Sequence, residues 1–104
     1  MSRSHGLQHG VEDWREALRS HADELAREHG VESLGLFGSH VRGEASPGSD
    51  LDVLVTFSRP VSLLDFVALE ERLSELLGVR VDLVMRDALK PHIGERILKE
   101  VMPV

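Results

Sequence analysis

Residues 31–57 read VESLGLFGSHVRGEASPGSDLDVLVTF, two short apolar runs joined by a loop rich in glycine and serine. The first run, residues 31–37, has the length of a strand and ends at a Gly-Ser pair, where the chain must turn. The second run, residues 50–57, alternates with the two-residue period of a strand. Its apolar face comprises Leu51, Val53, Val55 and Phe57. Its opposite face comprises Asp50, Asp52, Leu54 and Thr56, so two carboxylates share one face of a predicted strand.

Segments with helical periodicity lie before and after these two strands. Before them, the larger apolar residues of the segment 11–28 recur at helical spacing, and Gly30 provides a C-terminal cap. After them, Ser62 and Asp65 have the spacing of a capping box at the start of a second helix. Gly78 ends that helix. The apolar face of the second helix comprises Phe66, Leu69, Leu73, Leu76 and Leu77.

The C-terminal third of the chain predicts one more strand and one more helix. Residues 79–85 alternate as a strand, with Asp82 on the face opposite Val79, Val81, Leu83 and Met85. Pro91 fits the first turn of a last helix, whose apolar residues recur every fourth position at Ile93, Ile97 and Val101. Residues 102–104 fit either a frayed end or a short edge strand.

The predicted elements follow the order helix, strand, turn, strand, helix, strand and helix. This alternation is typical of an α/β or α+β fold, in which a small sheet has helices packed on one face. The face of the sheet that carries the aspartates would then be open to water and ligands. We assign residues 11–104 to a single domain and residues 1–10 to a flexible N-terminal tail.

The composition excludes several classes of protein. The 104 residues include no cysteine, which rules out disulfides and zinc-thiolate sites and favours a reducing compartment. No segment approaches the ~18 consecutive apolar residues of a membrane span, and the first residues lack the apolar core of a signal peptide. The net charge of −6 disfavours direct binding to a nucleic-acid backbone. We therefore expect a soluble, cytoplasmic protein that does not bind membranes, and the charge disfavours a nucleic-acid partner held by general electrostatics.

Three features carry the residue types of a catalytic site. Gly38 and Ser39 directly follow a strand, where glycine lets backbone amides approach a phosphate and serine adds a hydroxyl donor. Asp50 and Asp52 lie on one strand face with Cα atoms about 6.6 Å apart, a spacing that lets both reach a shared cation. Asp82 lies in an otherwise apolar strand, where an unpaired carboxylate would be costly, so we expect it to bind a metal or a basic side chain.

Together these features suggest displacement at phosphorus by a two-metal arrangement, whose ions clamp the attacking and leaving oxygens. Asp50 and Asp52 would bridge two Mg²⁺ ions, for which Mn²⁺ can substitute, and hold a nucleoside triphosphate. Asp82 would bind the metal nearer the acceptor hydroxyl and help lower the pKa of that hydroxyl. Ser39 and the adjacent amides would hold the departing diphosphate. Arg42 would either brace the aspartates or neutralise phosphate charge.

Each feature alone also has a structural interpretation. A Gly-Ser turn or an Asp-x-Asp pair is common in proteins without catalytic function, and only their ordered combination indicates a site. Asp82 could instead form a structural ion pair with Arg80 or Arg86. The histidines show no paired metal-ligand spacing on one element, and the role of His40, which lies within the Gly-Ser turn, is left open.

The runs GSHVRGEA at residues 38–45 and SDLDVLV at residues 49–55 resemble the signature of the DNA polymerase beta-like nucleotidyltransferase superfamily. The short chain and VDLV at residues 81–84 are similar to its minimal nucleotidyltransferases, and the resemblance extends from about residue 31 to the C-terminus. It implies a mixed sheet in the nucleotidyltransferase fold and two divalent metal ions held by the catalytic residues Asp50, Asp52 and Asp82. The residues it implies for nucleotide binding are Gly38, Ser39, Arg42, Gly43 and Ser49.

The same resemblance implies a biological setting. Minimal proteins of this kind are similar to the antitoxins of pairs whose toxin is an all-helical HEPN ribonuclease, and some transfer AMP from ATP to a tyrosine of that toxin. It thus implies Mg²⁺-dependent transfer of AMP to a hydroxyl on a HEPN-type partner protein. Two alternatives stay open: an inert antitoxin that acts by direct binding, and a transferase acting on a small molecule or an RNA end. The nucleotide preference and any homo-oligomer are also left open.

Overall fold

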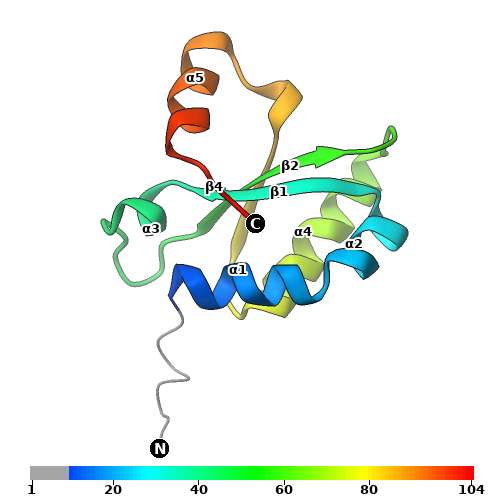
Figure 1. Cartoon of the computed structure of the whole chain (residues 1–104), viewed down its shortest axis with the longest axis horizontal. Coiled ribbons are helices and arrows are strands. Elements are labelled where there is room, and N and C mark those ends of the chain that lie inside the picture. Colours follow the sequence, from blue (N-terminus) through cyan, green and yellow to red (C-terminus); the bar gives the residue numbers. More distant parts are fainter. Residues whose placement is uncertain (1–9) are drawn as a thin grey trace, which may run out of the picture.

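The computed structural model describes residues 10–104, in which helices and strands alternate along the chain (Figure 1). The predicted tail, apart from Gly10, lies outside the described residues. The helices are α1 (Val11–Ser20), α2 (Ala22–His29), α3 (Ser39–Arg42), α4 (Leu63–Leu77) and α5 (Pro91–Glu100), with a 3-10 turn, η2, at Arg86–Ala88. The strands are β1 (Val31–Phe37), β2 (Leu51–Phe57), β3 (Val81–Met85) and β4 (Met102–Pro103).

The described strands form one mixed sheet in the order β3-β2-β1-β4. β1 pairs antiparallel with β2 and with β4, whereas β2 and β3 are parallel. The expected α/β fold with a small mixed sheet is confirmed. Of the two alternatives for residues 102–104, the edge strand is the one observed.

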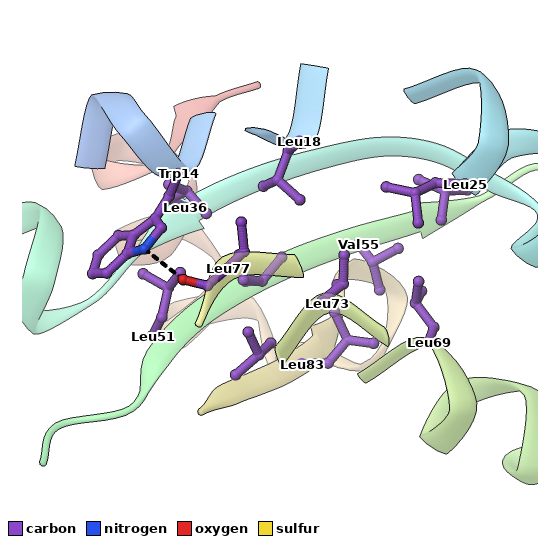
Figure 2. Packing of buried hydrophobic residues seen from close by; sticks show 13 residues of the cluster. Trp14, Leu18, Leu25, Leu36, Leu51, Val55, Leu69, Leu73, Leu77 and Leu83 are labelled. Carbon is purple, nitrogen blue, oxygen red and sulfur yellow. Dashed lines mark hydrogen bonds between the residues drawn. The ribbon is translucent and has the colours of Figure 1, made fainter. Parts of the chain in front are cut away.

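The hydrophobic core lies between one face of the sheet and the helices α1, α2 and α4, as expected from the sequence (Figure 1). Leucine and valine side chains fill it, and Trp14 closes one end (Figure 2). The Trp14 indole N–H donates a buried hydrogen bond of 3.1 Å to the Leu77 carbonyl at the end of α4. The expectation that the helices pack on one face was wrong for α5, which lies on the other side of the sheet (Figure 1). Its apolar residues Ile93 and Ile97 line a cleft beside the end of β1 and do not join the core. The face opposite the core is therefore covered only in part.

The segment predicted as one helix, residues 11–28, forms two helices that are separated at His21. The prediction of one continuous helix was therefore wrong. The backbone of His21 leaves helical geometry, with φ −108° and ψ 12°. Two side chains compete there for helix carbonyls: the Ser20 hydroxyl donates to the Glu16 carbonyl at 3.0 Å, and the His21 ring lies 2.9 Å from the Ala17 carbonyl. Such side-chain to backbone bonds bend helices. The apolar stripe survives the break, because Trp14, Leu18 and Leu25 are all buried.

The predicted helix ends are confirmed where capping chemistry decides them. Ser62 and Asp65 form the reciprocal capping box of α4. Gly78 ends α4, and Gly30 ends α2, both in the left-handed conformation. Pro91 opens α5. Within residues 10–104, no helix has the length and apolar character needed to cross a membrane.

Candidate active site

The Gly-Ser turn between β1 and α3 lies against the aspartate face of the sheet. Gly38 has φ 89° and ψ −160°, a left-handed geometry that favours glycine. A Cβ atom at this position would overlap the carboxylate of Asp52 on β2. Gly38 therefore serves two needs at once, because it turns the chain and lets the backbone approach a carboxylate. Ser39 follows as the first residue of α3 and is half-buried.

Asp52 and Asp82 are directly paired on the parallel strands β2 and β3. Asp52 also lies opposite Phe37, the last residue of β1, so the turn and both carboxylates meet at one edge of the sheet. Asp82 is exposed, contrary to the expectation that it needs a partner to offset burial. The error arose because its neighbours Val81 and Leu83 are buried on the core face, whereas Asp82 points to the open face.

Asp50 precedes β2 and lies beside a basic residue. Its Oδ1 is 3.7 Å from Nε of Arg80, a side chain that is 82% exposed. An ion pair of that length between solvated groups contributes little to stability. The structural alternative for Asp82, an ion pair with Arg80 or Arg86, is not observed within residues 10–104, because Arg80 is paired with Asp50.

The three aspartates affect one another electrostatically. Burial raises the pKa of Asp52 above its ordinary value, and the negative charges of Asp82 and Asp50 raise it further. His40 and Arg42 act in the opposite direction and offset part of this effect. A carboxylate in such surroundings gains from a nearby cation, because the cation relieves both the repulsion and the desolvation.

The donor set fits a divalent cation, although it is not fully assembled. Asp52 and Asp82 present acceptor-only oxygens side by side on an open face, which is the chemistry that Mg²⁺ prefers. Within residues 10–104, no three histidine, cysteine, aspartate or glutamate side chains are grouped closely enough to hold an ion by themselves. The third candidate ligand, Asp50, is engaged by Arg80.

Arg42 is braced by glutamates rather than by the aspartates. Its Nε lies 2.9 Å from Oε1 of Glu44, and its Nη1 lies 2.9 Å from Oε1 of Glu100 on α5. The Glu100 side chain also accepts a 2.7 Å hydrogen bond from the Gly38 N–H. Arg42 therefore forms ion pairs, as one alternative predicted, but its partners are glutamates and not the aspartates. One of them, Glu100, comes from α5 at the far end of the sequence.

The remaining turn residues organise the loop from α3 to β2. Gly43 caps α3 in the left-handed conformation, with φ 74°. The Ser49 hydroxyl accepts a 3.0 Å hydrogen bond from the Ser46 N–H and so closes the loop on itself. His40 points inward: its Nε2 lies 3.1 Å from the Ser49 carbonyl, and its ring packs edge-on against Trp14 at a centroid distance of 5.1 Å. His40 thus ties the turn to the start of β2.

Comparison with known proteins decides the family. The model of the family described as nucleotidyltransferase domain matches residues 18–102. The chain belongs to this nucleotidyltransferase family.

Relatives of the nucleotidyltransferase agree over nearly their whole length. The protein adenylyltransferase MntA of Thermococcus cleftensis is 49% identical over 94 residues, which cover 90% of this chain and 95% of that protein. A Methanocaldococcus jannaschii protein with a provisional name of protein adenylyltransferase is 38% identical over 95 residues. The match covers 90% of this chain and 97% of that protein. This chain is thus an enzyme of the nucleotidyltransferase class.

Solved structures support the same fold. One described as a minimal nucleotidyltransferase has a TM-score of 0.77 at 40% identity and covers 93% of this chain and 98% of its own. The resemblance to minimal nucleotidyltransferases is therefore confirmed. A toxin–antitoxin structure with AMP-PNP has a TM-score of 0.65 at 21% identity, covering 81% of this chain and 69% of its own, and shows the shared fold.

A cleft of about 330 Å³ opens beside Asp52 of this nucleotidyltransferase, whereas Asp82 and Asp50 are not among its lining residues. One wall is formed by the end of β1, Gly38, Arg42 and Asp52, and the other by α5. Its lining residues are Phe37, Gly38, Arg42, Asp52, Ile93, Arg96, Ile97 and Glu100. The α5 wall was not predicted, since no motif in the sequence marks Arg96 or Glu100. The only available signal was their position in the last helix before the edge strand.

Proposed function

We propose that this nucleotidyltransferase transfers AMP from ATP to a hydroxyl group of a partner protein, with Mg²⁺ as cofactor. The observation that carries the proposal is the pairing of Asp52 and Asp82 on an open sheet face beside the Gly38–Ser39 turn. Carboxylates and a phosphate-binding turn are the two components that phosphoryl-group chemistry requires in one place.

The aspartates would hold the metal. Asp52 and Asp82 are placed to do so as they stand, and Asp50 would join them by exchanging its weak pair with Arg80 for the cation. Two bound Mg²⁺ ions would supply charge neutralisation at the attacking and leaving oxygens, and Mn²⁺ has the same ligand preference. The oxygen ligands that this chain offers match that chemistry.

In the proposed reaction the acceptor oxygen forms a bond to the α-phosphorus of ATP while the bond from that phosphorus to the diphosphate breaks. The hydroxyl proton leaves toward Asp82 or solvent, and the diphosphate departs with the electron pair. Ser39, the nearby amides of the turn, Gly43 and Ser49 are proposed to border the triphosphate. Arg42 is proposed to neutralise phosphate charge, and its side chain lines the cleft.

A protein acceptor suits the size of the cleft. Pockets that enclose small ligands run from about 300 to 1,000 Å³, and this one, at about 330 Å³, is at the lower end. It can take part of a nucleotide but cannot also enclose an acceptor, which would then present its hydroxyl from its own surface. The adenylyltransferase name of the Thermococcus relative and the toxin–antitoxin neighbour point the same way. We propose a helical HEPN-type toxin as the partner and the cytoplasm as the compartment.

A second candidate function is an antitoxin that neutralises its partner by binding alone. The engagement of Asp50 by Arg80 favours it, because the three carboxylates are not gathered into one ligand group. Transfer to a small molecule or an RNA end is a third outcome, which the net charge of −6 disfavours for RNA.

The test uses labelled ATP, Mg²⁺ and the product of any adjacent gene that encodes a small helical protein. We expect label on the partner with the wild-type protein and with Asp87→Asn, a control that removes an exposed aspartate in η2, and no label with Asp82→Asn. Neutralisation of the partner should be lost in parallel. Neutralisation that persists in Asp82→Asn without label would support the binding antitoxin, and label on RNA or a small molecule instead of the partner would refute the proposed acceptor.

A further inference from the structure

The C-terminal residues are fastened to the sheet from two sides. β4 pairs with β1, and the Val104 N–H donates a 3.0 Å hydrogen bond to the Leu34 carbonyl. From α1, the Nε atoms of Arg15 and Arg19 donate to the carbonyls of Pro103 and Val104 at 3.1 and 3.2 Å. The last turn of α5, which directly precedes β4, is therefore held at a defined place beside the end of β1.

Because α5 is held in this position, its last residue, Glu100, contacts the Gly-Ser turn with both carboxylate oxygens. Oε2 accepts a 2.7 Å hydrogen bond from the Gly38 N–H. Oε1 lies 2.9 Å from Nη1 of Arg42. The Gly38 hydrogen bond and then the Arg42 contact lower the pKa of Glu100, so the side chain is a carboxylate at neutral pH. One side chain thus fixes both a backbone peptide and a guanidinium of the turn.

Arg42 retains donors for a ligand in this arrangement. A guanidinium has five N–H donors in a planar fork. Nε is directed to Glu44 and Nη1 to Glu100, and within residues 10–104 no hydrogen bond engages Nη2. The side chain is 45% exposed and lines the cleft. Glu44 and Glu100 therefore fix the plane of the fork, and Nη2 is left available to a ligand in the cleft.

We propose that Glu100 is a positioning residue for nucleotide binding: it holds Arg42 and the Gly38 peptide in the geometry that receives the triphosphate. This inference rests on the proposed function. It opposes a simple electrostatic expectation, since a carboxylate near a polyphosphate repels it and its removal should then strengthen binding. The two ideas predict opposite changes in the KM for ATP.

The test compares Glu100→Gln with Glu95→Gln, a control that removes one exposed charge from the same helix. Loss of two charge-assisted contacts should raise the KM for ATP about three- to tenfold in Glu100→Gln. The kcat should change less than about twofold, because the contact serves bound substrate and transition state alike. Glu95→Gln should leave both constants unchanged, and amide hydrogen exchange at Gly38 should become faster only in Glu100→Gln.

Glu100→Asp separates position from charge. It keeps the carboxylate but is one methylene shorter, so it cannot reach both donors and should also raise the KM. A KM that is unchanged or lower in Glu100→Gln, or unchanged in Glu100→Asp, would overturn the inference. If the wild-type protein neither binds ATP nor transfers label, the proposed function fails and this inference fails with it. If the wild-type protein is active and the variants keep its KM, only the inference fails.

Discussion

Replacing Asp52 with asparagine should stabilise the metal-free protein, although it removes a residue that we propose to be catalytic. Asp52 is paired with Asp82 on the neighbouring strand and is half-buried. Burial and the charges of Asp82 and Asp50 raise its pKa, so keeping it ionised costs free energy in the folded state. Asparagine keeps the shape of the side chain and removes the charge.

The size of the effect follows from the strand register. Paired residues on neighbouring strands lie about 5 Å apart. Two unit charges at about that distance repel by ~0.8 kcal/mol in water and by ~3 kcal/mol at an effective dielectric constant of ~20. Because Asp82 is exposed, solvent and salt screen the pair, and the lower figure applies. We expect a gain of about 1 kcal/mol in the free energy of unfolding, which is about 4 to 8 °C in Tm.

Thermal and urea unfolding in a chelator at pH 7 measures this gain, with Asp87→Asn as the control for loss of an exposed charge. The pH dependence has a defined sign. Because the folded-state pKa of Asp52 is raised, the wild-type protein loses stability as the pH rises through that pKa. The advantage of Asp52→Asn should therefore shrink at acidic pH, where Asp52 is protonated.

Metal provides the complementary measurement. Mg²⁺ with a non-hydrolysable ATP analogue at about 100 times its Kd should stabilise the wild-type protein by ~2.7 kcal/mol, and Asp52→Asn should gain much less. If Asp52→Asn is no more stable than the wild-type protein without metal, repulsion and burial do not destabilise Asp52. An equal gain in the free energy of unfolding in Asp87→Asn would refute that explanation too.

Three further changes and one control substitution test the structure in and around the site. Gly38→Ala should abolish transfer and lower the free energy of unfolding by about 3 kcal/mol or more, because its Cβ would overlap the neighbouring carboxylate. Gly78→Ala, at a similar positive φ but in open space, should cost only ~1 to 2 kcal/mol by urea titration. Trp14→Phe should lower the urea midpoint by an equivalent of ~1 to 2 kcal/mol, because a buried helix-end carbonyl loses its donor; an unchanged midpoint would mean that water replaces the indole. Arg80→Ala should cost less than ~1 kcal/mol in stability yet tighten Mg²⁺ binding by calorimetry, because it frees Asp50; weaker binding would contradict that role.

Local chemistry in the sequence determined much of the fold. Strand periodicity located β2 and β3, since alternating side chains must face opposite sides of a sheet. The length of the apolar run and the Gly-Ser pair that ends it located β1. Capping residues located the ends of α4, because Ser62, Asp65 and Gly78 satisfy backbone groups within a few residues of themselves. The alternation placed Asp52 and Asp82 on the polar faces of their strands, whereas their direct pairing is known only from the structure.

Contacts between distant segments were decided only by the tertiary structure. The break at His21 depends on side chains competing for carbonyls, which periodicity does not register. The exposure of Asp82 and the pairing of Asp50 with Arg80 depend on which face the helices leave uncovered. Glu100 is 62 residues from Gly38 in sequence, and only the pairing of β4 with β1 brings the two together. Sequence pattern thus determines which face of an element is apolar, whereas packing determines which polar groups meet across the remaining face.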